Sequence, residues 1–110
     1  MNVVLITAMA AYLVTMSSSA AQNLEHFSGA DFLSVCTSPA PGEAGFCQGY
    51  VQAVVDGFHR PGEQFCPPGT TRRRQVVGDV VDQLQTEPSL RSASAFSVVY
   101  AYLVVTFPCT

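Results

Sequence analysis

Lysine and tryptophan are both absent from this 110-residue chain, and only 12% of its residues are charged. A globular domain usually has about twice that share, roughly 25%. Five arginines against eight acidic residues leave a formal net charge of −3. Because a nucleic-acid-binding protein needs a basic surface, nucleic acid is not the expected partner. Hydrophobic residues make up 48% of the chain, which excludes a disordered polymer and indicates one small folded domain.

Recognisable catalytic motifs are also lacking. The sequence contains no glycine-rich phosphate loop, no H-E-x-x-H and no G-x-S-x-G pattern. Of its two histidines, His26 lies before the first predicted helix and His59 lies at the end of the second, where a cation suits the helix dipole. Asp79 and Asp82 could hold a metal ion, but a solvated helix face is the better interpretation of the pair. We therefore predict that the chain is not an enzyme and uses no metal or cofactor.

Residues 1–21 have the pattern of a secretory signal peptide. An apolar run from Val3 to Val14 is followed by polar residues, and Ser19 and Ala21 suit the −3 and −1 positions of a cleavage site. The run of about 12 residues is shorter than the roughly 20 that span a bilayer, so an uncleaved membrane anchor is a weaker alternative, as is a helix that belongs to the domain. We predict cleavage after Ala21, export to the periplasm and no membrane attachment of the mature chain.

All four cysteines lie beyond the predicted signal peptide. An even number of cysteines in a small exported domain predicts two disulfide bonds. The alternative is a zinc site, but the sequence has no C-x-x-C pair and neither histidine lies beside a cysteine. The predicted disulfide-forming residues are Cys36, Cys47, Cys66 and Cys109.

Hydrophobic spacing predicts four helices. Ser28 is a suitable N-cap for the first, which covers about 29–35. The second covers about 46–58, and the third begins after a cap at Thr70 or Thr71 and ends near Thr86. Proline and glycine mark the loops at 37–42 and 57–69. The apolar stripes consist of Phe46, Tyr50, Val51, Val54, Val55 and Phe58 in the second helix and Val76, Val77, Val80, Val81 and Leu84 in the third.

The last segment, about 92–107, is rich in β-branched and aromatic residues, which favours a strand. A single strand has no pairing partner among helices, however, and the segment lacks clean alternation. Residues 92–110 carry no charge, but Pro108 and Cys109 at the end argue against a membrane span. We predict a buried helix at the centre of a bundle.

Four short helices with short loops predict an all-α, up-down four-helix bundle braced by two disulfides. The first helix ends at Cys36 where the second begins at Cys47, so these cysteines meet at one end of the bundle. The third helix starts just after Cys66 and the fourth ends at Cys109, which brings the second pair together at the opposite end. We therefore predict the pairs Cys36–Cys47 and Cys66–Cys109.

Two surface segments are candidates for binding a partner protein. The connection 85–91 combines a rigid proline with an exposed Leu90, and it could enter a groove of a partner because a preorganised loop costs little to order. The three consecutive arginines that open the third helix suit an acidic partner. A plain helix connection and a solvated helix start are the alternatives. The candidate partner-binding residues are Glu87, Ser89, Leu90 and Arg91 in the connection and Arg72, Arg73 and Arg74 in the helix.

Four motifs in register carry a resemblance to a known family. They are SGADFLSVC at 28–36, FCQGYV at 46–51, FCPPGT at 65–70 and FPC at 107–109. Together they resemble the Rap/Tai immunity proteins, which protect bacteria from peptidoglycan amidases delivered by type VI secretion. The resemblance implies a helical periplasmic domain at 28–110, of a kind that is often dimeric, that blocks the active-site groove of an amidase. Residues 22–27 are predicted to be a short entry segment before this domain. The arginines oppose the dipole of the third helix, so compensation by an acidic partner or by Glu63 is expected.

A second function class competes with the first. Small disulfide-bonded acid chaperones of the HdeA type expose apolar surface when acid titrates their carboxylates, and this chain has few other charges. Dimerisation fits either function, because low surface charge leaves apolar area to cover. A chaperone should suppress the aggregation of unrelated proteins at low pH, whereas an inhibitor should not.

Overall fold

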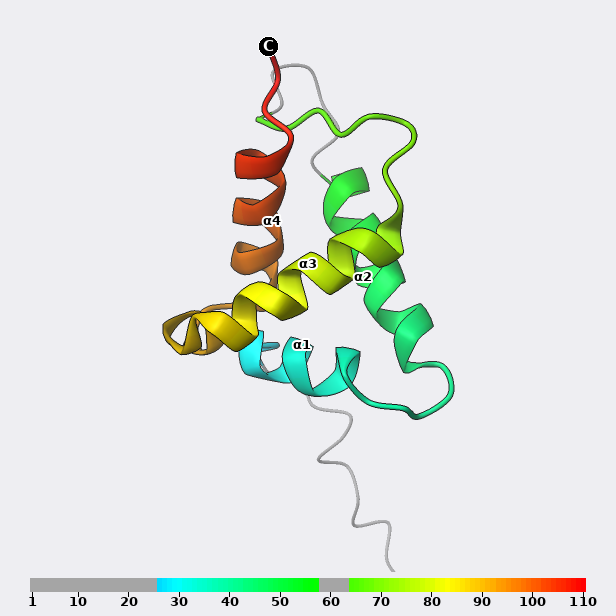
Figure 1. Ribbon diagram of the computed structural model, residues 1–110, viewed down its shortest axis with the longest axis vertical. Coiled ribbons are helices and arrows are strands. Elements are labelled where there is room, and N and C mark those ends of the chain that lie inside the picture. Colours follow the sequence, from blue (N-terminus) through cyan, green and yellow to red (C-terminus); the bar gives the residue numbers. More distant parts are fainter. Residues whose placement is uncertain (1–25, 58–63) are drawn as a thin grey trace, which may run out of the picture.

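The computed structural model describes residues 26–57 and 64–110, and within these two ranges the chain is helical and has no strand (Figure 1). The predicted all-α fold with four helices is confirmed. The predicted signal peptide, most of the entry segment, His59 and Glu63 lie outside the described residues. The elements are α1 Gly29–Cys36, α2 Glu43–Gly57, α3 Arg73–Thr86, the short 3-10 helix η3 Pro88–Ser92, and α4 Ala95–Thr106.

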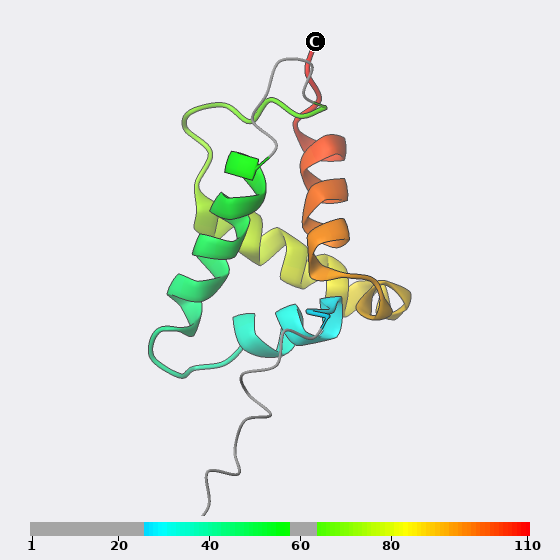
Figure 2. The ribbon, with the colours of Figure 1, turned by 180° about the vertical axis from the view of Figure 1, so that it is seen from behind.

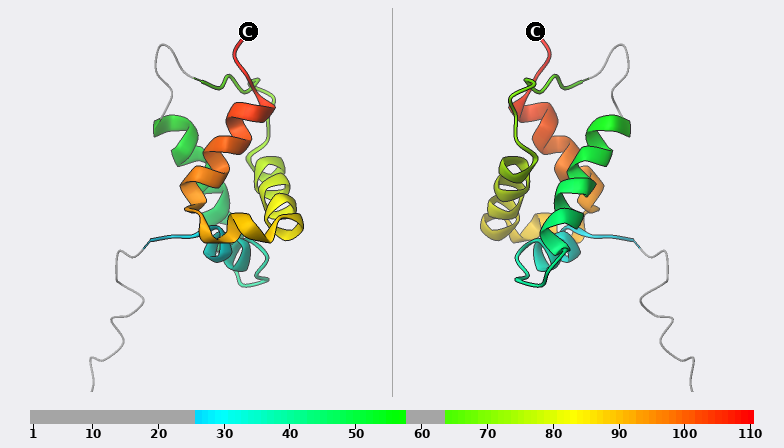
Figure 3. Two further views of the ribbon diagram at one scale, coloured as in Figure 1. Left: turned by 90° about the vertical axis from the view of Figure 1, so that its left-hand side faces the viewer. Right: turned by 90° about the vertical axis from the view of Figure 1, so that its right-hand side faces the viewer.

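The helices cross one another and do not lie as four parallel rods. Seen from the front and from behind, α2 and α4 stand side by side, and α1 lies across their lower ends (Figures 1 and 2). Helix α3 runs obliquely across one face of the α2–α4 pair (Figure 1), and the two side views show that it lies on that face (Figure 3). The result is a small bundle in which every helix contacts the other three.

One hydrophobic core joins the four helices. Its largest buried side chains are Phe32 of α1, Phe65 of the segment before α3, Leu84 of α3 and Leu103 of α4. The stripe predicted for the third helix is correct in its spacing, with one side fully buried and the other half-buried. In α2 the prediction is wrong for Phe46, which is 50% exposed. The remaining core residues are Val51, Val54, Val76, Val80, Ala95, Val98 and Val99.

Side-chain caps are present at the starts of α1 and α4, and the start of α3 differs from the prediction. Ser28 caps α1 as predicted: its Oγ accepts from Asp31 N at 3.1 Å, and its own N–H donates to Asp31 Oδ2 at 2.9 Å. Ser94 caps α4 through the N–H of Ser97. The predicted cap of the third helix is wrong, because Arg72 is the N-cap and contributes no side-chain hydrogen bond. Thr71 instead closes a turn by donating its N–H to Pro68 O at 2.9 Å.

The segment predicted as a buried helix is helical, but it is buried on one side only. Val98, Val99 and Leu103 are in the core, whereas Val105 is 80% exposed. Tertiary contacts with the other helices therefore override the strand propensity of this sequence. The outer side of α4 remains as an apolar surface.

Both predicted disulfides are present. Cys36–Cys47 joins the end of α1 to α2 with 5.8 Å between the two Cα atoms. Cys66–Cys109 joins the segment before α3 to the C-terminus with 5.0 Å between the Cα atoms, and the N–H of Cys66 donates to Phe107 O at 2.7 Å. The two bonds brace opposite ends of the bundle, as the helix order predicts.

Candidate functional site

The connection between α3 and α4 forms a projecting corner, which we call the η3 corner (residues 87–92; Figure 1). Its outward side chains are Glu87, Pro88 and Ser89, all of which are exposed. Leu90 is half-buried and packs against the core, so the expectation of an exposed leucine is wrong. Leu90 is the middle residue of the 3-10 helix η3, and this turn directs its side chain toward the core.

Arg91 has a structural position that sequence reasoning did not foresee. Its Nε donates to Leu84 O at 2.8 Å, and its Nη2 donates to Gln85 O at 3.3 Å. The carbonyl groups of the last helical turn have no partner within the helix, and a cation is favourable at that end of the dipole. Arg91 thus caps α3 and fixes the η3 corner, and its guanidinium group is engaged within the chain.

Gly29 allows the η3 corner to lie directly against α1. A Cβ atom at this position would lie 2.7 Å from Leu90 O and 2.9 Å from Leu84 Cδ2. Both distances are shorter than real Cβ contacts, so a side chain here would displace the corner. The backbone is tied down as well, since the N–H of Gly29 donates to Ala93 O at 2.8 Å. Close packing and this hydrogen bond therefore both attach the corner to α1.

The three arginines lie at the start of α3 and are all exposed. Within the part of the chain that the structure describes, no hydrogen bond or ion pair holds the guanidinium groups of Arg72, Arg73 or Arg74. Positive charge at a helix N-terminus opposes the dipole by about 0.3–1 kcal/mol per exposed group. The predicted compensation by Glu63 lies outside the described residues.

A groove runs between α2 and α3, and we call it the α2–α3 groove. Its centre is a hollow of about 600 Å³ lined by Gln48 and Gln52 of α2 and by residues 71–74. A hollow of about 380 Å³ adjoins it and shares Gln52, Thr71 and Arg73 with it. On the other side, a hollow of about 320 Å³ shares Gln48 and Arg74. The three hollows adjoin one another at these shared residues, and the name α2–α3 groove covers all three of them.

Sequence reasoning missed the two glutamines of this groove. Gln48 and Gln52 are four residues apart and therefore lie on the same side of α2. Four small residues of α2 lie beside them: Ala44, Gly45, Gly49 and Ala53. Long polar side chains among small ones at helical spacing are a signal that the sequence does contain.

The outer side of α4 borders a shallow hollow of about 270 Å³ between α3 and α4. Ala101 and Val105 line it from α4, and Asp79 lines it from α3. The hydroxyl of Tyr102 donates to Asp79 Oδ2 at 2.5 Å. Burial, and then this hydrogen bond, raise the pKa of Tyr102 to about 12. Asp79 thus has a partner within the chain and joins α3 to α4.

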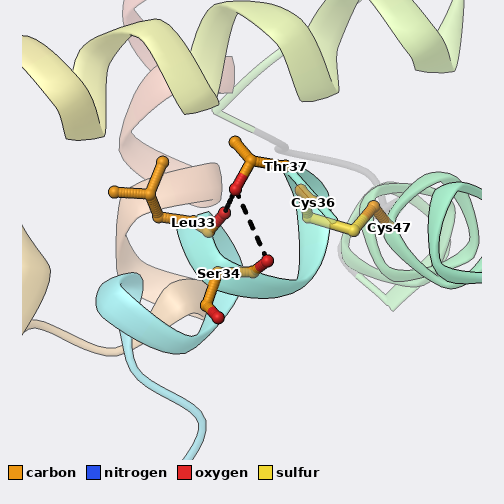
Figure 4. The surroundings of a disulfide bond; sticks show 5 residues. All are labelled: Leu33, Ser34, Cys36, Thr37 and Cys47. Carbon is orange, nitrogen blue, oxygen red and sulfur yellow. Dashed lines mark hydrogen bonds between the residues drawn. A yellow bond between two sulfur atoms is a disulfide. The ribbon is translucent and has the colours of Figure 1, made fainter. Parts of the chain in front are cut away.

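The surroundings of the Cys36–Cys47 bond are structural in character. Thr37 donates its hydroxyl to Leu33 O at 2.6 Å and to Ser34 O at 3.4 Å, which closes the last turn of α1 (Figure 4). The disulfide lies beside this turn and reaches across to α2 (Figure 4). The four cysteines are all bonded, so none of them has a free thiol.

Metal ligands do not gather in the residues that the structure describes: no three or more His, Cys, Asp or Glu side chains are close enough to hold an ion.

None of the described helices combines the length and hydropathy needed to cross a membrane.

Comparison with known proteins gives one result. The sequence model of a family described as Rap1a immunity proteins matches residues 28–109. The match spans the four helices, both disulfides, the η3 corner and the α2–α3 groove. No curated protein and no solved structure matches the chain significantly. The resemblance carried by the four sequence motifs is confirmed.

Proposed function

Because the chain belongs to the Rap1a family of immunity proteins, whose function is to bind a toxic effector, we propose that its target is a peptidoglycan amidase. The amidase is one delivered by type VI secretion, and the chain inhibits it by occluding the active-site groove. The observation that carries this proposal is the match over residues 28–109. Inhibition takes place in the periplasm, after removal of the predicted signal peptide 1–21.

The η3 corner is the element that enters the groove of the amidase. It projects from the bundle and presents Glu87, Pro88 and Ser89 to solvent (Figure 1). Its underside is fixed by Arg91 and by the close approach to Gly29. A corner that is already ordered loses little conformational entropy on binding, which favours high affinity for a small contact.

The protein forms a homodimer through the outer side of α4. Val105 is 80% exposed there, and residues 92–110 contain no charged side chain. Exposed apolar area of this kind is typical of a surface that another protein covers. A second copy presents the same uncharged surface, so the contact can be symmetric.

Co-expression tests the function. Each hydrolase encoded beside this gene is directed to the periplasm of a bacterial host, with and without the full chain. We expect lysis with the hydrolase alone and normal growth when this chain is co-expressed. If the chain protects against none of these hydrolases, the proposal is contradicted. Suppression of the aggregation of unrelated proteins at low pH, without any specific partner, would instead identify the HdeA-type function.

A further inference from the structure

The α2–α3 groove has a positively charged centre that the fold does not use. Arg72, Arg73 and Arg74 lie in consecutive positions at the positive end of the α3 dipole, and no described residue pairs with them. The chain as a whole is acidic, so this cluster is a local reversal of charge. Stability alone favours acidic residues at a helix start. The cluster therefore points to a negatively charged ligand.

The carboxylates near the groove leave this centre positive. Asp56 accepts a hydrogen bond from Gln52 Nε2 at 2.8 Å and lies one helical turn beyond the central hollow. Asp82 lines the far end of the 320 Å³ hollow, two helical turns from Arg74. Neither of these carboxylates lines the central hollow, where the three arginines face the two glutamines.

Apolar walls lie on both sides of the charged centre. The 380 Å³ hollow is lined by Val51, Val55 and Pro67, and the 320 Å³ hollow is lined by Val77 and Val81. A ligand that fills the whole groove must therefore carry negative charge in its middle and apolar groups at both ends. The two outer carboxylates disfavour a nucleic acid strand, which is negatively charged along its whole length.

We infer that the α2–α3 groove binds an extended acidic segment of the effector. Carboxylates of the segment contact Arg72, Arg73 and Arg74, and apolar side chains on either side of them occupy the two outer hollows. The identity of the partner rests on the proposed function, whereas the chemistry of the ligand rests on the groove alone. The groove and the η3 corner lie at opposite ends of α3, which is about 20 Å long at 1.5 Å per residue, so one partner can contact both.

A peptide assay tests the chemistry of the groove without the effector. The probe is a fluorescein-labelled synthetic peptide with three glutamates between two leucines on each side, and its control has glutamines in place of the glutamates. The protein variants are R73Q/R74Q and the matched control A30E/S34E. Both change the net charge by the same amount, and the control positions are exposed on α1, outside the groove. Thermal unfolding verifies that both variants are folded.

We expect the acidic peptide to bind the wild-type protein and to bind R73Q/R74Q about tenfold more weakly. Binding of the A30E/S34E control should change less than twofold, and added salt should weaken wild-type binding. Equal binding of the glutamine peptide, or equal affinity of R73Q/R74Q, would overturn the inference. So would a change in the solution mass of R73Q/R74Q, because a second copy would then occupy the groove.

The same variants separate the groove from the proposed function. If an effector that the chain neutralises binds R73Q/R74Q as tightly as wild type, the groove inference fails and the proposed function stands. If the acidic peptide binds but no effector does, the proposed function fails and the ligand chemistry of the groove stands.

Discussion

Substitution of Gly29 by alanine gives the sharpest test of how the η3 corner is held. The new Cβ atom would lie 2.7 Å from Leu90 O, 2.9 Å from Leu84 Cδ2 and 3.2 Å from the Cα atom of Arg91. Two of these neighbours are backbone atoms, so the corner must move away from α1. Overpacking of this kind costs about 1–3 kcal/mol, and the better helix propensity of alanine offsets at most about 1 kcal/mol.

Gly49→Ala is the matched control, because it adds the same methyl group within a helix. A Cβ atom at Gly49 has nothing within 4 Å, so alanine there should stabilise the protein by about 0.5–1 kcal/mol. The two variants should therefore shift the free energy of unfolding in opposite directions, measured by urea denaturation with the disulfides intact. Each kcal/mol corresponds to about 4–8 °C in Tm for a domain of this size. A Gly29→Ala protein as stable as wild type would refute the close packing of α1 against the corner.

Four other perturbations have defined outcomes. The Ser28 N–H, and then its side chain, lower the pKa of Asp31 below 3.8, so the stability that this capping box contributes is present above that pH and lost as the pH falls. In urea titrations at decreasing pH, Asp31→Asn should lose less free energy of unfolding in acid than the wild type. An unchanged pH dependence of the free energy of unfolding would contradict the capping role. Tyr102, whose pKa is about 12, contributes stability below pH 10 that is lost between pH 10 and about 12; Tyr102→Phe should cost about 1 kcal/mol at neutral pH and remove the highest step from the phenolate absorbance titration. The double variant Cys66→Ser/Cys109→Ser opens a loop of 43 residues and should lower the free energy of unfolding by about 4 kcal/mol in denaturant titrations. Loss of the Cys36–Cys47 bond opens a loop of 11 residues and should cost less, roughly 3 kcal/mol. The reverse order would contradict the loop-closure argument. Val105→Glu should convert the proposed homodimer to a monomer in sedimentation analysis, and an unchanged mass would exclude the outer side of α4 as the interface.

The helices and disulfide pairs could be predicted because several independent signals agree at each of them. Ser28 followed by Asp31 is a capping box that the sequence shows directly, and the order of cysteines relative to helix ends restricts their pairing. For α4 two signals conflict, since β-branched residues favour a strand while the absence of a pairing partner favours a helix. The segment is helical, so the absence of a pairing partner predicts its structure correctly and the strand propensity does not.

The local details of the surface could not be predicted, because they depend on contacts between elements. The sequence predicts an exposed Leu90, but α1 approaches closely at Gly29 and provides a surface against which Leu90 packs. The sequence predicts that Arg91 contacts a partner, but its guanidinium group donates hydrogen bonds to the carbonyl groups at the end of α3. Helix α3 begins after both threonines that could cap it, because a turn from Pro68 to Thr71 precedes the helix.

The surroundings of the arginines of α3 could not be predicted from the sequence. Their charge and exposure are evident in the sequence, but the wall opposite them belongs to α2. Gln48 and Gln52 become part of the same groove only after α3 packs across α2 (Figure 3). A groove between two helices is a property of their packing, and neither segment predicts it alone.

The most direct test of an immunity function is a titration of enzyme activity. Purified effector from the same locus is mixed with increasing amounts of the chain with both disulfides formed, and peptidoglycan hydrolysis is measured at each ratio. An immunity protein should lower the activity linearly to zero at a fixed stoichiometric ratio, with the bound complex inactive. Full hydrolysis in the presence of excess chain, whether or not the two proteins bind, would contradict an immunity function.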